Sequence, residues 1–80
     1  MTTEDLASKE NPDLSIVIPT WNGLDLLRRN LPSVLEAQRR LLVDCRLSSE
    51  LIIVDDASTD ETVDRVPLEF PLARLVCRAK

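Results

Sequence analysis

Short apolar runs alternate with polar stretches along the chain, and three of these runs have the length and composition of strands. Residues 14–18 are rich in β-branched side chains and are interrupted by Pro19, which predicts a buried strand followed by a loop over residues 19–23. Residues 51–54 predict a second buried strand that ends at two aspartates. Residues 73–77 predict a third.

Two stretches between these runs have helical character. Leucines and valines at helical spacing predict an amphipathic helix over about residues 24–42. Pro32 removes a backbone donor inside it, so either the helix kinks or a second helical piece starts there, and we favour a kinked helix. Ser58-Thr59-Asp60-Glu61 fits a capping box with Ser58 as the N-cap and Glu61 at the third helical position, which predicts a short helix that stops before Pro67.

The predicted order is therefore β-α-β-α-β. Strands that are apolar throughout and alternate with helices imply a parallel sheet with right-handed crossovers, which is one half of a doubly wound α/β fold. Ligands of such sheets bind outside the carboxyl ends of the strands. The loops at residues 19–23 and 55–60 both lie at that edge, whereas residues 1–13 are polar, lack periodicity and predict a flexible tail.

Composition and charge exclude several classes of protein. The chain has 80 residues, about half of a usual domain, and a net charge of -4, which argues against nucleic acid as a partner. No apolar run approaches the length of a membrane span, and the acidic start does not resemble a secretory signal. Cys45 and Cys77 are expected to be free thiols, so we expect a cytoplasmic location, with membrane association possible in a longer form.

Missing residue types remove further chemistries. Gly23 is the only glycine, which excludes the glycine-rich dinucleotide fingerprint and the phosphate loop. The absence of histidine excludes a Cys/His zinc site and a Ser-His or Cys-His catalytic pair.

Asp55 and Asp56 follow a buried strand, and two carboxylates there cannot both enter an apolar core at a reasonable cost. Acids repel phosphate, but a carboxylate suits a ring N–H of a nucleobase, a ribose hydroxyl or a hard cation. The simpler interpretation is that the pair only satisfies backbone donors and the start of the next helix. Ser58 and Thr59 fit helix caps better than nucleophiles.

Trp21 lies in the other loop at this edge. It is either a plug in the core or a flat platform on which a ring stacks. A base stacked on Trp21 with its N–H groups aimed at an aspartate is a plausible pocket, and Pro19 and Thr20 would form its wall. Asn22 fits a role in the turn better than a role in ligand binding.

These residues resemble the start of a family 2 glycosyltransferase, a family with the GT-A fold. The resemblance rests on Ser-Ile-Val-Ile-Pro-Thr-Trp-Asn-Gly at residues 15–23, on Asn-Leu-Pro-Ser-Val-Leu in the helix, and on Glu-Leu-Ile-Ile-Val-Asp-Asp-Ala-Ser-Thr-Asp-Glu-Thr at residues 50–62. It covers about residues 14–80. Small departures are Trp21, where Tyr is commoner, and Ala57, where Gly is common.

The resemblance implies transfer of a sugar from a nucleotide-diphospho-sugar donor to an acceptor. Pro19 and Thr20 then line the nucleotide pocket, Trp21 takes the place of the aromatic residue that stacks on the base, and Asp56 matches the acid that hydrogen-bonds the base. Asp55 is a weaker candidate for the pocket.

A divalent metal, Mg²⁺ or Mn²⁺, is implied for the full-length family. The Asp-x-Asp that binds it and the catalytic base follow the third strand in that family, and this sequence ends at Lys80, so we expect neither metal ligands nor catalytic residues in these 80 residues. We therefore expect a partial domain over residues 14–80 that is inactive alone and exposes a sheet edge and an apolar face.

Two alternatives remain. One is a non-catalytic, truncated nucleotide-binding fragment. The other is a receiver-type signalling domain, because Leu-Ile-Ile-Val-Asp-Asp at residues 51–56 also resembles the acidic pair of that class. The receiver alternative leaves residues 14–23 unexplained.

Overall fold

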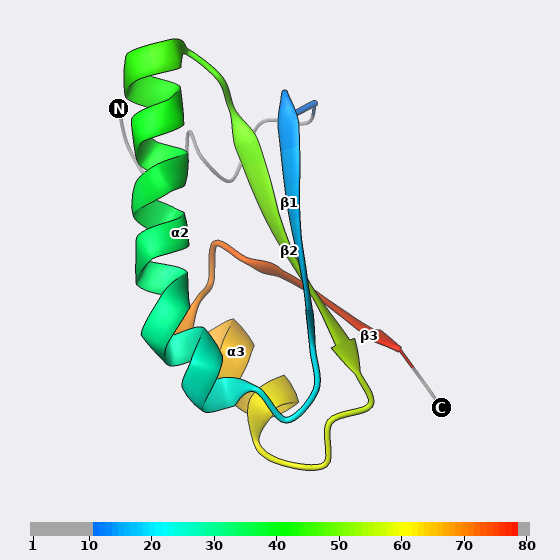
Figure 1. Cartoon of the computed structure of the whole chain (residues 1–80). Coiled ribbons are helices and arrows are strands. Elements are labelled where there is room, and N and C mark those ends of the chain that lie inside the picture. Colours follow the sequence, from blue (N-terminus) through cyan, green and yellow to red (C-terminus); the bar gives the residue numbers. More distant parts are fainter. Residues whose placement is uncertain (1–10, 79–80) are drawn as a thin grey trace.

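The computed structural model describes residues 11–78, which form a three-stranded parallel sheet and two helices (Figure 1). The elements follow the predicted order, and the strands lie in the order β1-β2-β3. Their bounds are Leu14–Thr20 for β1, Leu24–Cys45 for α2, Ser49–Asp56 for β2, Thr62–Glu69 for α3 and Arg74–Arg78 for β3. The predicted α/β class and β-α-β-α-β topology are confirmed.

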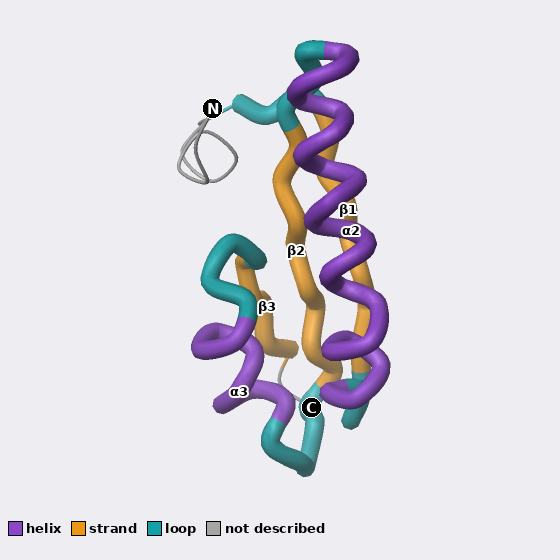
Figure 2. Tube along the Cα trace, turned by 90° about the vertical axis from the view of Figure 1, so that its left-hand side faces the viewer, coloured by secondary structure: helices purple, strands orange, loops and turns teal. Residues whose placement is uncertain are grey.

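Both helices cover the same face of the sheet, as Figures 1 and 2 show. Burial along β2 alternates accordingly, with every second residue from Ser49 to Asp55 buried. The buried core consists of apolar side chains from both helices and the central strand. They are Leu24, Leu27 and Leu31 of α2, Leu51 and Ile53 of β2, and Val66 of α3.

The opposite face of the sheet has no helix in the described part of the chain. Val17 on β1 and Val76 on β3 lie on this open face, with 55% and 37% of their surface exposed. The apolar face that the sequence predicts is therefore present among residues 11–78.

The first strand is longer than predicted. Pro19 and Thr20 belong to β1, where Pro19 is the register partner of Val54 and Thr20 that of Asp55. Proline is tolerated because β1 is an edge strand of the described sheet, where a missing N–H need not break the ladder. The loop before α2 is thus shorter than residues 19–23.

The first helix is a single one. Pro32 lies inside α2, which runs three residues past the predicted end. A polar residue also lies on its inner face: Gln38 is buried and its Nε2 donates to the carbonyl oxygen of Ser49 at 3.2 Å. This contact attaches α2 to the start of β2.

The predicted capping box is wrong. Helix α3 begins at Thr62 with Glu61 as its N-cap, and neither Ser58 nor Glu61 makes the expected capping hydrogen bond. The hydroxyl group of Ser58 is instead engaged by Asp55, and the backbone turns at Ala57, which has a φ of 57°. The carboxylate of Asp60 accepts the backbone N–H of Thr62 at 2.9 Å and satisfies the first turn of the helix.

The prediction that this helix stops before Pro67 is also wrong, because α3 continues to Glu69. Two contacts hold the turn that contains the proline. The N–H of Phe70 donates to the carbonyl oxygen of Val66 at 2.8 Å, and Arg65 pairs with Glu69 at 3.0 Å. Arg28 of α2 also reaches Glu69 with two hydrogen bonds of 2.8 and 2.7 Å, which join the two helices.

The predicted tail, residues 1–13, lies mostly outside the described residues. Asp13 is described and is not loose. Its N–H donates to the carbonyl oxygen of Ser48 at 3.0 Å, and its carboxylate accepts the N–H of Ser48 at 2.8 Å. These bonds fix the start of β1 beside the start of β2.

Candidate functional site

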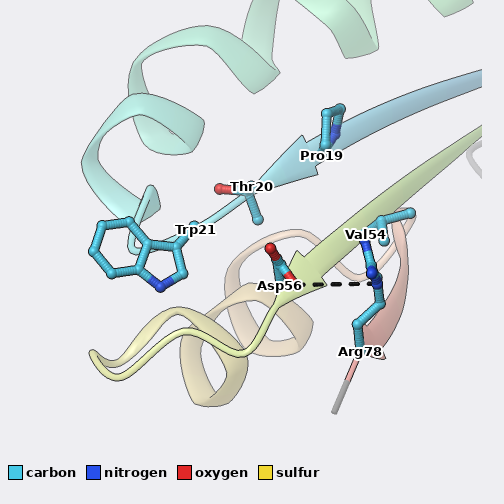
Figure 3. A pocket seen from close by; sticks show the side chains of 6 residues that line it. All are labelled: Pro19, Thr20, Trp21, Val54, Asp56 and Arg78. Atoms are coloured by element: carbon cyan, nitrogen blue, oxygen red, sulfur yellow. Dashed lines mark ion pairs between the residues drawn. The ribbon is translucent and has the colours of Figure 1, made fainter. Parts of the chain in front are cut away.

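A pocket of about 290 Å³ lies at the carboxyl ends of the three strands (Figure 3). The loops that follow β1 and β2 lie at the same end of the sheet (Figure 2). This is the edge at which parallel α/β sheets bind ligands. Its lining residues come from all three strands and the first loop, and they are Pro19, Thr20, Trp21, Val54, Asp56 and Arg78.

Two register pairs contribute to the lining. Pro19 pairs with Val54, and Asp56 pairs with Arg78. Because side chains alternate along a strand, Val54 and Asp56 both point to the open face of β2, away from the helices. The pocket therefore has an apolar part beside a charged part.

Trp21 stands at one side of this pocket with 59% of its surface exposed. The exposure excludes the core plug that the sequence left open. In Figure 3 the indole ring stands apart from the strand ends, with Asp56 between it and Arg78. An exposed aromatic ring beside an apolar floor can stack with a planar ligand.

The loop that carries Trp21 is held by its neighbour Asn22. The N–H of Asn22 donates to the hydroxyl oxygen of Ser58 at 2.8 Å, and its side-chain Oδ1 accepts the N–H of Thr59 at 2.7 Å. Asn22 has a φ of 47°, a left-handed conformation that asparagine adopts more readily than most residues. The expected turn role of Asn22 is thus present, and it also joins the two loops.

Gly23 follows and packs closely against the pocket wall. A Cβ atom at this position would collide with the hydroxyl oxygen of Thr20. Only glycine therefore lets α2 begin here without displacing Thr20.

The two adjacent aspartates have different surroundings. Asp55 is fully buried, and its carboxylate accepts the N–H of Ser58 at 2.9 Å as well as the Ser58 hydroxyl. Asp56 is 62% exposed at its side chain and lines the pocket. Asp55 thus satisfies local donors, as in the simpler interpretation, whereas Asp56 is available to a ligand.

Of the five predicted site residues, the structure brings together Pro19, Thr20, Trp21 and Asp56, and it leaves Asp55 out of the pocket. Sequence reasoning missed Arg78. Its signal is its place at the end of the third strand, but the register that sets it beside Asp56 is visible only in the sheet.

A second carboxylate near the end of β2, that of Asp60, also serves the loop itself. Asp60 accepts hydrogen bonds from the hydroxyl group and the backbone N–H of Thr62, and these bonds lower the pKa of Asp60. With Asp55 and Asp60 engaged, Asp56 is the carboxylate of this loop that lines the pocket.

Residues 11–78 contain no group of three or more Asp, Glu, Cys or His side chains that could hold a metal ion. The divalent metal that the family implies therefore does not fit the described residues, and we derive no step through it. In the same range, no helix is long and apolar enough to cross a membrane.

The described residues thus form a Rossmann-like α/β half with a pocket at the strand ends. The model of the family "Glycosyl transferase family 2" matches residues 15–67, which include both β1 and β2 with the loops that follow them. The chain belongs to this family. No curated protein and no solved structure matches it.

Membership supports a glycosyl transfer function in general and implies a nucleotide-sugar donor and an acceptor. It also confirms the resemblance that the sequence motifs carry, because both motifs lie within the matched residues. The receiver-type alternative is therefore excluded.

Proposed function

We propose that the pocket binds the nucleotide of a nucleotide-diphospho-sugar donor for glycosyl transfer. The observation that carries the proposal is the placement of the exposed Trp21 ring and the exposed Asp56 carboxylate in one pocket at the strand ends. A nucleobase offers a planar face to the ring and N–H donors to the carboxylate. Pro19 and Val54 supply an apolar surface for the rest of the base.

The proposal assigns donor binding, not catalysis, to these residues. Trp21, Pro19 and Thr20 hold a ring in place, and Asp56 accepts a hydrogen bond, but none of these groups is positioned against a described acceptor site. We therefore propose that the 80-residue chain binds a donor nucleotide without transferring sugar by itself. An assay for transfer from a donor sugar to added acceptors tests this second part separately.

We also propose a cytoplasmic location. Cys45 and Cys77 are both exposed and free, which suits a reducing compartment. Fractionation of cells that produce the tagged chain tests this proposal.

Calorimetric titration of the chain with UDP and with GDP tests donor binding. We expect measurable binding of at least one of them, and a loss of affinity of about tenfold or more in Asp56→Ala and in Trp21→Ala, since each removes a contact worth roughly 1–3 kcal/mol. Asp44→Ala is the matched control, because Asp44 is an exposed acid at the far end of α2.

Thermal unfolding of each variant establishes that the pocket substitutions leave the fold intact. Equal affinity in wild type, Asp56→Ala and Trp21→Ala would remove the basis of the proposal. So would the absence of binding to the wild-type chain.

A further inference from the structure

The two outer strands of the sheet differ in how well their free edges are protected. Among the described residues β1 and β3 lie on opposite sides of β2, and each has β2 as its strand neighbour (Figure 2). Edge strands usually carry charged side chains that prevent pairing with another chain. β3 has such charges, since Arg74 and Arg78 lie exposed at its two ends. β1 has no charged side chain, and none of its residues is buried, so it is the edge open to another strand.

The backbone of β1 determines which groups this edge offers. The N–H of Leu14 donates to the carbonyl oxygen of Ser48 at 3.1 Å, so Leu14 points its backbone groups toward β2. The direction alternates from one residue to the next in a parallel ladder, so Ser15 and Val17 point theirs outward. Pro19 belongs to the same outward set, which is where an edge strand tolerates a missing N–H. The free edge therefore offers the N–H and carbonyl groups of Ser15 and Val17.

This pattern of donors and acceptors is complementary to itself. Two copies of β1 that run antiparallel about a two-fold axis at Ile16 place Ser15 opposite Val17 of the second copy. Directly opposed residues of this kind exchange both of their hydrogen bonds in an antiparallel ladder. The two symmetry-related pairs use the outward N–H groups of Ser15 and Val17 in both copies. Pro19 falls just beyond them, so its missing N–H costs no bond.

The side chains of β1 also fit a second copy. Leu14 and Val17 are 44% and 55% exposed, and Ile16 and Ile18 are only partly buried against the core. In the antiparallel arrangement Ile16 faces Ile16 of the second copy, and Leu14 faces Ile18. Such cross-strand apolar pairs stabilise antiparallel ladders, and an uncharged strand brings no like charges together.

The open face of the sheet is a poorer contact surface for a second copy. Glu50, Asp56 and Arg74 lie on this face beside its valines, in register with Ser15, Arg78 and Ile52. Stacking two such faces would remove these charges from water, and that desolvation is costly. The edge of β1 buries backbone groups that find partners and no charged group.

We propose that the free edge of β1 is a dimerisation site, at which a second copy of this chain adds its own β1 in antiparallel orientation about an axis at Ile16. The pairing joins the two sheets into one across the two-fold axis. Its hydrogen bonds end before Pro19, whereas the pocket begins there. The inference is therefore independent of nucleotide binding.

The test measures the mass of the 80-residue chain by sedimentation equilibrium over a dilution series, with a reducing agent that keeps Cys45 and Cys77 from crosslinking. We expect a reversible equilibrium of monomer and dimer. Val17→Pro removes an outward N–H from each copy, and it spares the ladder with β2. We expect this substitution to raise the dissociation constant of the dimer about tenfold or more.

Cys77→Pro is the matched control at the other edge. The alternation that turns Leu14 toward β2 also turns Asp55 toward β3, so Cys77, the register partner of Asp55, points its N–H away from the sheet. We expect this variant to dimerise like the wild type. Circular dichroism establishes that both proline variants keep the fold.

Hydrogen exchange of the wild-type chain tests the same edge without any substitution. The amides of Ser15 and Val17 should exchange about tenfold more slowly when the dimer forms, because pairing gives both of them an acceptor. The outward amide of Cys77 should keep its rate. If Val17→Pro does not fold, this measurement decides alone.

Four results would overturn the inference. One is a chain that stays monomeric up to about 1 mM, where even a weak specific association is populated. Another is a dimer that a folded Val17→Pro leaves intact, and a third is a dimer that Cys77→Pro weakens as much. The last is exchange at Ser15 and Val17 that does not slow with increasing concentration.

Discussion

Asp55 and Asp56 are neighbours in the chain, yet their carboxylates lie on opposite faces of β2. Asp55 is buried under the helices and bonded to Ser58, whereas Asp56 is exposed in the pocket. The alternation of side chains along a strand produces this separation. One carboxylate therefore stabilises the fold, and the other is free for a ligand.

This separation predicts that the same substitution affects stability strongly at Asp55 and hardly at all at Asp56. Asp55→Asn replaces a buried acceptor of two hydrogen bonds, and we expect it to lower the free energy of unfolding by about 1–3 kcal/mol. Asp56→Asn should change it by less than about 0.5 kcal/mol, because the side chain is exposed and outside the core. Urea unfolding followed by circular dichroism measures both, and equal losses of stability would contradict the assignment.

Replacing Asn22 should loosen the junction of the two loops, because its side chain joins them. Asn22→Gly keeps the left-handed backbone but removes the acceptor of the Thr59 and Asp60 N–H groups, whose distances to Oδ1 are 2.7 and 3.3 Å. We expect faster hydrogen exchange at these two amides, and a loss of about 1 kcal/mol in the free energy of unfolding. Asn22→Ala should cost more, since alanine adds backbone strain at a φ of 47°. Unchanged exchange in Asn22→Gly would show that the side chain does not hold the loop.

Ser48 and Ser49, at the point where β2 begins, should respond differently in stability when each is replaced by alanine. The Oγ of Ser49 is buried and has no hydrogen-bond partner among residues 11–78, so Ser49→Ala should leave stability unchanged or raise it by up to about 1 kcal/mol. The Oγ of Ser48 accepts the N–H of Asp13 and donates to its carboxylate, each at 3.1 Å. Ser48→Ala should therefore lower stability by about 0.5–1.5 kcal/mol. Thermal unfolding of the two variants side by side decides the matter, and a larger loss in Ser49→Ala would contradict it.

The junction of α2 and α3 predicts a dependence of stability on pH. Hydrogen bonds from Arg28, and then from Arg65, lower the pKa of Glu69 from 4.5 to about 2. Because the pKa is lower in the folded state, the contribution of Glu69 is fully present above pH 4.5 and is lost as the pH falls from 4.5 towards 2.

Denaturant unfolding at several pH values in this window measures the effect. Glu69→Gln should flatten the decline in stability, whereas Glu36→Gln should flatten it less, since Glu36 pairs with Arg39 within one helix and both are exposed. An identical decline in wild type and Glu69→Gln would show that the helix junction does not titrate in this range.

The fold followed from the sequence because its strands are short, apolar and separated by a clear helical period. The positions of the four pocket residues also followed, since the loops after parallel strands meet at one edge. The start of α3 did not follow, because the Ser58 hydroxyl is taken by Asp55 and Asn22, and no local pattern reveals these contacts. Arg78 was missed for a similar reason: its pairing with Asp56 depends on the strand register.

The most direct test of the central claim follows the amide and indole N–H signals of the ¹⁵N-labelled chain by NMR as UDP or GDP is added. The account predicts saturable shifts at the indole N–H of Trp21 and at the backbone amides of Thr20, Asp56 and Arg78. The shifts along the C-terminal half of α2 should be smaller. Shifts that avoid these residues at saturation, or that cluster elsewhere on the chain, would contradict a nucleotide site at the strand ends.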